Sequence, residues 1–229
     1  MDNLSGRINI NCEHKNSHMT CFFILLAYFI GAIPSSVWFG KSLYNIDIRE
    51  HGSGNAGATN TIRILGKRIG FTVLFIDILK AWFATSILSE LAGNQSIEYM
   101  LALGLVAVLG HIFPIYVGFR GGKGIASLLG VIIAIHPLAS LFSVIVFVIC
   151  LIISRFVSLS SIISACSFPL LLIFHFKNEN NSLLIFSFMV AILVIFTHKK
   201  NIERLFKKEE SRVKLPKKIF RRKSRNKMN

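Results

Sequence analysis

Long runs of apolar residues constrain this chain more than any other feature of its sequence. A helix that crosses the hydrocarbon core of a membrane needs about 20 mostly apolar residues. Of the 229 residues, 53% are hydrophobic, yet the formal net charge is +15. A soluble domain has roughly 45–50% apolar residues, so this composition indicates an integral membrane protein with basic edges. The clear candidate spans are residues 20–40, 71–91, 99–117, 157–176 and 182–197.

One further apolar stretch, residues 124–154, is too long for one untilted span and short for two. His136-Pro137 lies near its middle, and proline breaks helices or marks their ends. We therefore divide it into a short helix at 124–135 and a longer one at 138–154. The predicted fold class is an all-α polytopic membrane protein with about seven transmembrane helices.

The basic residues test this topology, because cytoplasmic loops carry an excess of lysine and arginine. With the N-terminus outside, the inner segments hold 22 of the 26 basic residues, and 14 of these lie from Lys199 onward. A single unbroken helix at 124–154 would put that tail outside. The charge distribution therefore favours the break, an outside N-terminus and a cytoplasmic C-terminus.

Three regions follow along the chain. Residues 1–18 are an N-terminal extension, 19–210 a single seven-helix membrane domain, and 211–229 a basic cytoplasmic tail. Met19 directly precedes the first apolar run and is a candidate for the natural start. The tail is interpreted as a topology anchor, with contact to anionic lipid as the alternative. No group of cysteine, histidine or acidic residues has metal-ligand spacing, so neither a metal nor a cofactor is expected.

The segment HGSGNAGATNTIR, residues 51–63, raises the question of a nucleotide site. Its glycines match the G-x-G-x-x-G fingerprint, but that motif needs a strand before it within a soluble βαβ unit, and here membrane helices precede and follow. A P-loop frame also fits, except that Ala58 replaces the lysine. A flexible loop and a phosphate site remain. Glycines let backbone N–H groups approach an anion, and Ser53 and Arg63 complete a cradle, so we favour phosphate binding.

A second polar segment, GHIFPIYVGFRGGKGIAS at 110–127, repeats this chemistry. Lys123 lies among Gly121, Gly122 and Gly124, just before an apolar helix whose N-terminus favours an anion. A turn that only satisfies the positive-inside rule needs a basic residue but not three glycines. Two loops of glycines and cations on one face suggest two phosphate groups held close together.

The remaining polar segments are THKKNIERLFKKEE (197–210) and SRFVSLSS (154–161). His198 and Asn201 share a helix face, and His198 is a base, a phosphate ligand or an interfacial histidine. Inside the second span, Asp77 and Lys80 are three residues apart. Each would cost about 2.5–3.5 kcal/mol alone at mid-membrane, so the two form either a wall of the active site or a structural ion pair.

Together the four segments resemble the bacterial acyl-phosphate:glycerol-3-phosphate acyltransferase family over residues 19–210. The resemblance rests on HGSGNAGATNTIR, GHIFPIYVGFRGGKG, RFVSLSS and HKKNIERL, and on their order and spacing. It implies a seven-helix catalytic domain with an outside N-terminus. It also implies transfer of a fatty acyl group from acyl phosphate to the 1-hydroxyl of glycerol 3-phosphate, giving lysophosphatidate and inorganic phosphate for phospholipid biosynthesis. The chain departs from the family at Lys208, where a glycine is usual, although Glu210 keeps the acid position of the same motif. It also departs at Ser127, where threonine is common.

By this resemblance, Ser53, Arg63, Lys123 and His198 are the expected catalytic residues. The implied partners are glycerol 3-phosphate, fatty acyl phosphate and membrane lipids, with contact to the enzyme that makes acyl phosphate and none to nucleic acid. The implied location is the bacterial inner (plasma) membrane, with the site on the cytoplasmic side. The expected substrate-binding residues are Gly52, Gly54, Asn55, Gly57, Asn60, Gly121, Gly122, Gly124, Ser158 and Asn201.

The expected mechanism relies on positioning and charge, because an acyl phosphate already has a good leaving group. Arg63 and Lys123 would neutralise two phosphates. No nucleophile–base–orienter set is visible, so the glycerol hydroxyl would attack directly and lose its proton to His198 or to a substrate phosphate oxygen.

Two other classes of protein remain as alternatives. The first is a transporter or channel for a phosphorylated metabolite, because broken helices that aim their N-termini at anions occur in transporters too. Against it, the polar loops lie on one side and no inverted repeat is visible. The second is a membrane-anchored nucleic-acid binder that uses the basic tail.

Overall fold

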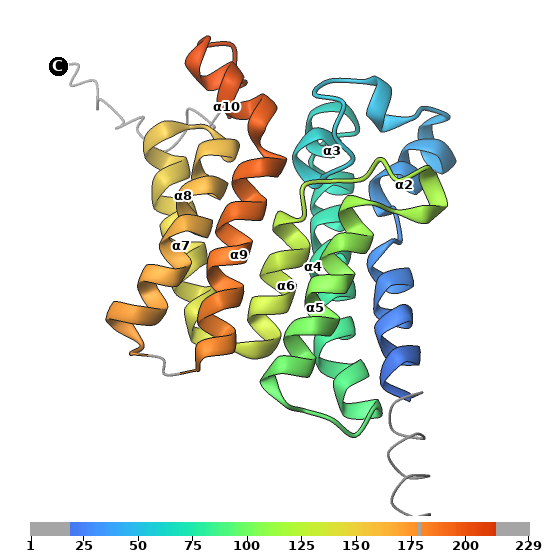
Figure 1. The fold of residues 1–229 in the computed structure, drawn as a ribbon. Coiled ribbons are helices and arrows are strands. Elements are labelled where there is room, and N and C mark those ends of the chain that lie inside the picture. The colour runs from blue at the N-terminus through green and yellow to red at the C-terminus, as the bar shows by residue number, and fades with distance from the viewer. Residues whose placement is uncertain (1–18, 178–179, 214–229) are drawn as a thin grey trace, which may run out of the picture.

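The computed structural model describes residues 19–177 and 180–213, and this part of the chain contains helices and loops but no strand (Figure 1). Three short turns, η1 (Ile48–Glu50), η2 (Ile115–Val117) and the π-helical turn η3 (Leu171–His175), connect longer elements. The predicted extension and most of the predicted tail lie outside the described residues. The helices are Met19–Gly31, α2 (Ser35–Tyr44), α3 (Ala58–Ile64), α4 (Lys67–Leu91), α5 (Ile97–Ile112), α6 (Ile125–Ile135), α7 (Pro137–Ser154), α8 (Val157–Leu170), α9 (Asn181–Thr197) and α10 (Lys199–Phe206).

Each of the seven predicted apolar segments is largely helical, which confirms the all-α fold class. Four segments are long and apolar enough to cross a membrane alone: Lys67–Leu91, Ile97–Val117, Pro137–Ser154 and Val157–His175. Two further candidate spans are bent pairs, namely Met19–Gly31 with α2 at 40° and α9 with α10 at 60°. The apolar helix α6 is shorter, with 11 residues. Seven crossings and the sides on which the termini lie therefore stay predictions.

The predicted break within 124–154 is present, and its cause is local. Helix α6 ends at Ile135, and α7 begins at Pro137, where the missing N–H of proline removes no helical hydrogen bond. His136 caps α7, because its Nδ1 accepts a hydrogen bond from the Ala139 N–H at 3.3 Å.

The first apolar run differs from the prediction of one continuous helix over 20–40. The helix that begins at Met19 ends at Gly31, and α2 begins at Ser35, directly after Pro34. A proline inside a helix removes a hydrogen bond and clashes with the preceding turn, which accounts for the interruption. The break leaves the Ile33 carbonyl without a helical partner, and it accepts a hydrogen bond from Lys80 Nζ at 2.7 Å instead.

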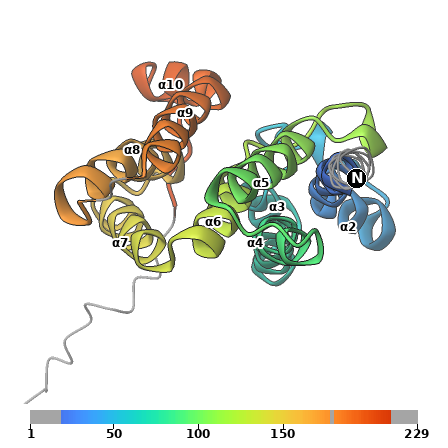
Figure 2. The same ribbon diagram turned by 60° about the horizontal axis from the view of Figure 1, so that its bottom comes forward.

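The helices form two groups, seen side by side in Figure 2. Met19–Gly31, α4, α5 and α6 make one group, and α7, α8 and α9 make the other. Helix α6 packs very close to α4 at Gly130, which has no side chain. A Cβ at this position would lie only 2.2 Å from the Ile78 carbonyl oxygen. One buried apolar cluster joins the groups, with Val108 and Val131 from the first and Phe168 and Val194 from the second.

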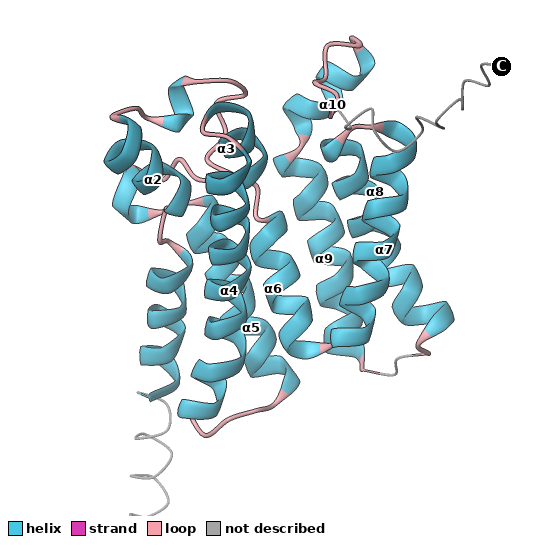
Figure 3. Cartoon of the chain, turned by 180° about the vertical axis from the view of Figure 1, so that it is seen from behind, coloured by secondary structure: helices cyan, strands magenta, loops and turns pink. Residues whose placement is uncertain are grey.

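The four polar segments meet at one end of the bundle, as the sequence predicts. Figures 1 and 3 show α3, the loop before α6, the α7–α8 turn and α10 at this end, opposite the α4–α5 loop. The end of the described chain is tied there too, since the Val213 N–H donates to the Arg155 carbonyl at 2.8 Å. The side of the membrane that this end faces stays a prediction.

Candidate functional site

Asn60, on α3, anchors the first glycine loop from inside. It is 1% exposed, and its Oδ1 accepts a hydrogen bond from the Ser53 backbone N–H at 2.9 Å. Its amide nitrogen donates to the Ile48 and His51 carbonyls, both at 3.0 Å. Both amide protons are therefore used within the protein. The structure gives Asn60 a loop-holding role, and its predicted contact with substrate stays a prediction.

The glycines of this loop produce a tight turn around that anchor. Gly52 and Gly54 have φ values of +63° and +72°, a backbone conformation that residues with a side chain rarely adopt. The Gly54 N–H donates to the His51 carbonyl at 3.1 Å, which closes the turn. The Ser53 hydroxyl is exposed and has no hydrogen-bond partner among the described residues. It is therefore available to a ligand.

Arg49 connects the first loop to the second. Its Nη1 donates to the Val117 carbonyl at 2.6 Å and to the Arg120 carbonyl at 3.3 Å. Asp47 holds the guanidinium in place, with Nη2 at 2.6 Å from Oδ2. This arginine also lowers the pKa of Asp47 to about 2 by hydrogen bonding. Sequence reasoning treated Arg49 only as an inner-side charge and missed this link.

The second glycine loop lies against the C-terminal end of α5. The Gly121 N–H donates to the Ile112 carbonyl at 3.1 Å, and the Gly122 N–H donates to the His111 carbonyl at 3.2 Å. A Cβ on Gly122 would lie 2.1 Å from His111 Nε2. These two glycines thus have a packing role that the sequence did not predict. Gly124, with φ +81°, begins α6 beside them.

Lys123 enters a hydrogen-bonded set that we call the polar network: Lys123, Ser158, Asn201, Arg204 and Glu210. Lys123 Nζ donates to Asn201 Oδ1. Glu210 Oε1 accepts from Asn201 Nδ2 at 2.8 Å and from the Ser158 hydroxyl at 2.7 Å. Arg204 Nε donates to the other oxygen, Oε2, at 2.8 Å. The network brings together three predicted site residues: Lys123, Ser158 and Asn201.

Glu210 is the centre of this network, and it was absent from the predicted site set. Burial raises the pKa of its carboxyl group, but hydrogen bonds from Arg204, Asn201 and Ser158 and the charge of Arg204 outweigh burial, so the pKa lies below its usual value. The carboxylate therefore stays charged and orients three donors. Only its match to the acid position of the last motif signalled it in the sequence.

His198 lies at the bend between α9 and α10 and is 3% exposed. Its Nδ1 is 2.8 Å from the Val194 carbonyl, which can only accept, so Nδ1 carries the proton. Burial, and next the charge of Lys123, lower its pKa to about 4. The ring is thus neutral at pH 7. Its Nε2 has a free lone pair and no hydrogen-bond partner among the described residues.

Arg63, on α3, adds a cation with no hydrogen bond or ion pair in the described part of the chain. Burial lowers the pKa of Lys123 to about 8; Glu210 opposes this shift, while Arg204 and Arg63 add to it. Three cations thus act around one carboxylate, and the site carries an excess of positive charge. No described interaction links Ser53 to the polar network.

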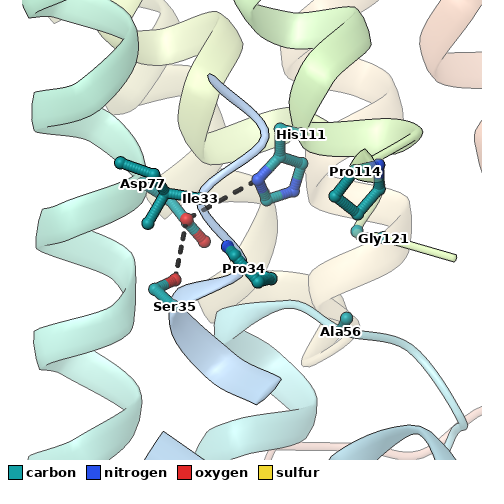
Figure 4. Close-up of a pocket in the computed structure, with 9 residues that line it drawn as sticks. Ile33, Pro34, Ser35, Ala56, Asp77, His111, Pro114 and Gly121 are labelled. Atoms are coloured by element: carbon teal, nitrogen blue, oxygen red, sulfur yellow. Dashed lines mark hydrogen bonds and ion pairs between the residues drawn. The ribbon is translucent and has the colours of Figure 1, made fainter. Parts of the chain in front are cut away.

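A second polar group, the buried charge cluster, consists of Ser35, Asp77, Lys80 and His111. Lys80 Nζ is 2.9 Å from Asp77 Oδ1 and 3.1 Å from His111 Nδ1. The Ser35 hydroxyl donates to Asp77 Oδ1 at 2.9 Å, and Figure 4 shows Ser35 and His111 both directed at this carboxylate. The structure shows the predicted ion pair of Asp77 and Lys80, buried within the bundle, while their role as a wall of the active site stays a prediction. Within residues 19–177 and 180–213, no three histidine, cysteine or acidic residues gather as a metal site.

Comparison with known proteins adds a family to this geometry. A family model described as glycerol-3-phosphate acyltransferase matches residues 21–208. The glycerol-3-phosphate acyltransferase of Fusobacterium nucleatum is 41% identical over 192 residues, which are 84% of this chain and 97% of that protein. The enzyme of the same name from Enterococcus faecalis is 43% identical over 197 residues, 83% of this chain and 90% of its own.

Two crystal structures of an integral membrane glycerol 3-phosphate acyltransferase are also similar. Its glycerol 3-phosphate form has a TM-score of 0.79 and 37% identity, and the match covers 85% of this chain and 96% of that one. Its lysophosphatidic acid form has a TM-score of 0.76 and 36% identity, with 85% and 95% covered.

Proposed function

Because the chain belongs to the glycerol-3-phosphate acyltransferase family, and is a membrane-embedded enzyme of phospholipid synthesis that acylates glycerol 3-phosphate, we propose that its acyl donor is a fatty acyl phosphate. The products are then 1-acylglycerol 3-phosphate and inorganic phosphate. The resemblance of four separate motifs to the acyl-phosphate-dependent family supports this donor.

The observation that carries the proposal is the excess of cations around the polar network. The electrostatic surroundings of Lys123 contain two further cations, Arg204 and Arg63, and a single carboxylate, Glu210. His198 is neutral at pH 7. Both proposed substrates end in a phosphate, so a productive complex brings two anions together. Fixed cations that are already in place stabilise such a pair without reorganisation during the reaction.

Direct transfer fits the side chains that are available. The 1-hydroxyl oxygen of glycerol 3-phosphate attacks the acyl carbonyl carbon, and the bond from that carbon to the phosphate oxygen breaks. The hydroxyl proton goes to His198 Nε2 or to an oxygen of a substrate phosphate, the leaving group included. The Ser158 hydroxyl donates to Glu210, but this carboxylate also accepts from Asn201 and Arg204, which lower its pKa and make it a weak base. Direct attack by the substrate hydroxyl is therefore simpler than an acyl-enzyme route.

The proposed setting is the bacterial plasma membrane, with the polar network at the cytoplasmic edge. The positive-inside distribution of lysine and arginine supports this side. The acyl chain then lies along the apolar helices or in the lipid, and contact with the enzyme that makes acyl phosphate would shorten the path of this reactive donor. A transporter would place such a site near mid-membrane instead.

A donor comparison in detergent tests the proposal. Purified protein receives glycerol 3-phosphate with fatty acyl phosphate, acyl-CoA or acyl carrier protein as the donor, and lysophosphatidate is measured. Lysophosphatidate is expected to form only when fatty acyl phosphate is the donor. Product that forms only with acyl-CoA or acyl carrier protein would overturn the proposed donor, and uptake into vesicles without any product would favour the transporter.

A further inference from the structure

The buried charge cluster plays no part in the proposed chemistry, yet it lies beside both loops that do. His111 contacts Gly122 of the second glycine loop. Asp77 and His111 also line a small pocket together with Ala56 of the first loop.

Lys80 and Asp77 fix the His111 ring and its tautomer. An ammonium group only donates hydrogen bonds, so His111 Nδ1, 3.1 Å from Lys80 Nζ, is the acceptor in this contact, which requires the tautomer with its proton on Nε2. Lys80 Nζ also contacts Asp77 Oδ1 at 2.9 Å and the Ile33 carbonyl at 2.7 Å. All three of its donor positions thus have protein partners, which leaves the imidazole little freedom to turn.

The second glycine loop rests on this ring and on its backbone. A Cβ on Gly122 would lie 2.1 Å from His111 Nε2, and the Gly122 N–H donates to the His111 carbonyl at 3.2 Å. Gly122 is the residue directly before Lys123. The position of the His111 ring therefore determines where the chain that leads into Lys123 runs.

The first loop meets the same point. The position of that Cβ is also 3.2 Å from the Ala56 carbonyl oxygen, and this oxygen accepts a hydrogen bond from Ser36 at 2.9 Å. A cavity of about 10 Å³, lined by Asp77, His111, Ala56 and Gly122 among others, lies between cluster and loops (Figure 4). The cluster and both loops thus border one small space, near the size of a single water.

We propose that His111 is a positioning residue for Lys123. Asp77 and Lys80 hold the imidazole, the imidazole sets the path of Gly121 and Gly122, and that path fixes Lys123 relative to Arg63 and the polar network. This inference rests on the proposed role of Lys123 as a phosphate-neutralising cation.

The first test is a double-mutant cycle of His111→Asn with Lys123→Ala, measured as kcat/KM for lysophosphatidate formation. Asparagine can keep an acceptor for Lys80 while it removes the ring edge beneath Gly122. In the wild-type background, His111→Asn is expected to lower kcat/KM by about 10- to 100-fold, since a misplacement of about 1 Å has effects of that size. In the Lys123→Ala background it is expected to change kcat/KM by less than about twofold, because the group it positions is gone.

A matched control separates positioning from general damage. His136 also uses Nδ1 as an acceptor, for the Ala139 N–H, but lies at the α6–α7 break. His136→Asn should therefore leave kcat/KM unchanged, and the thermal unfolding temperature of every variant is recorded. Equal fold losses from His111→Asn in both backgrounds would overturn the inference alone. Full activity of Lys123→Ala would overturn the role of Lys123 and the inference together.

A rescue experiment gives a second readout that remains useful if His111→Asn folds poorly alone. Gly122→Ala drives a methyl group into the His111 ring and should lower kcat/KM by about tenfold or more. Combination with His111→Asn makes room for the methyl group, so the double variant should be more active than Gly122→Ala. A double variant less active than either single variant would contradict the inference.

Discussion

The buried charge cluster and the polar network each contain a lysine, but the two lysines differ in how many of their hydrogen-bonding positions the protein fills. In the cluster, Lys80 has a protein partner for each of its three donors. At the network, Lys123 donates to one described partner, and His198 Nε2 and Arg63 have none. A group whose hydrogen-bonding positions are all filled by the protein has none left for a ligand, whereas a group with open positions can bind one. The difference supports the proposal that substrate binds at the polar network and that the buried charge cluster holds the network's surroundings in place.

The largest expected effect on stability comes from the removal of one charge from the buried charge cluster. Asp77 is 1% exposed, and Asp77→Ala leaves Lys80 buried and unpaired. The free energy of unfolding should fall by about 3–5 kcal/mol, as for other buried pairs that lose one partner. Thermal unfolding in detergent measures this loss. Asp77→Ala with Lys80→Met should recover part of it; an unfolding temperature that Asp77→Ala leaves unchanged would contradict the account.

The centre of the polar network should respond in both activity and stability. Glu210→Ala removes the acceptor of Ser158, Asn201 and Arg204, and the unsatisfied donors should destabilise the fold by about 1–3 kcal/mol. Because Asn201 also binds Lys123, kcat/KM should fall by about tenfold or more. The free energy of unfolding and kcat/KM are both measured on one purified sample. Glu209→Ala, at the exposed neighbouring residue, is the control. A fall in stability with full activity would show that the network does not position Lys123.

Arg63 should show the opposite pattern to Asp77. It is exposed and unpaired in the described residues, so Arg63→Ala should leave the unfolding temperature nearly unchanged. The loss of one phosphate-neutralising charge should lower kcat/KM by about tenfold to a hundredfold. Lys67→Ala, which removes an exposed cation four residues along the chain at the start of α4, serves as the control. Equal activities of the two variants would remove Arg63 from the site.

The smallest expected effect is a dependence of kcat/KM on pH. The pKa of Lys123 is lowered to about 8, so its ammonium charge is present below pH 8 and is lost as the pH rises through this value. The kcat/KM of the free enzyme should therefore decline above about pH 8. Lys123→Arg keeps its charge at these pH values, so its profile from pH 7 to 9.5 should stay flat, whatever its absolute rate. A parallel decline in both proteins would assign the titration to another group.

Local signals predicted much of the fold. Apolar runs located the helices, and His136-Pro137 located a break, because proline acts on its own turn. The same signal at Pro34 was overridden by the apolar run around it, so the interruption after Gly31 was missed. The gathering of the polar segments at one end followed from the order and lengths of the spans.

The site was harder to predict where it depends on contacts between distant segments. Lys123, Ser158, Asn201 and His198 were named from motifs, but Glu210 joins Ser158 across 52 positions. Likewise, Gly121 and Gly122 suggested a phosphate cradle, whereas their N–H groups bond to the end of α5. Nothing in the spacing of His111 signalled that a glycine would rest on its ring.

The most direct test of the central claim is the initial rate of lysophosphatidate formation by purified Lys123→Ala, beside wild type, with fatty acyl phosphate and glycerol 3-phosphate. A fall of about 10²- to 10³-fold in kcat is expected, with an unfolding temperature close to that of the wild type. A variant that folds normally and keeps more than about half of the wild-type rate would contradict the proposed role of Lys123, because the loss of a charge-stabilising group lowers kcat far more than twofold.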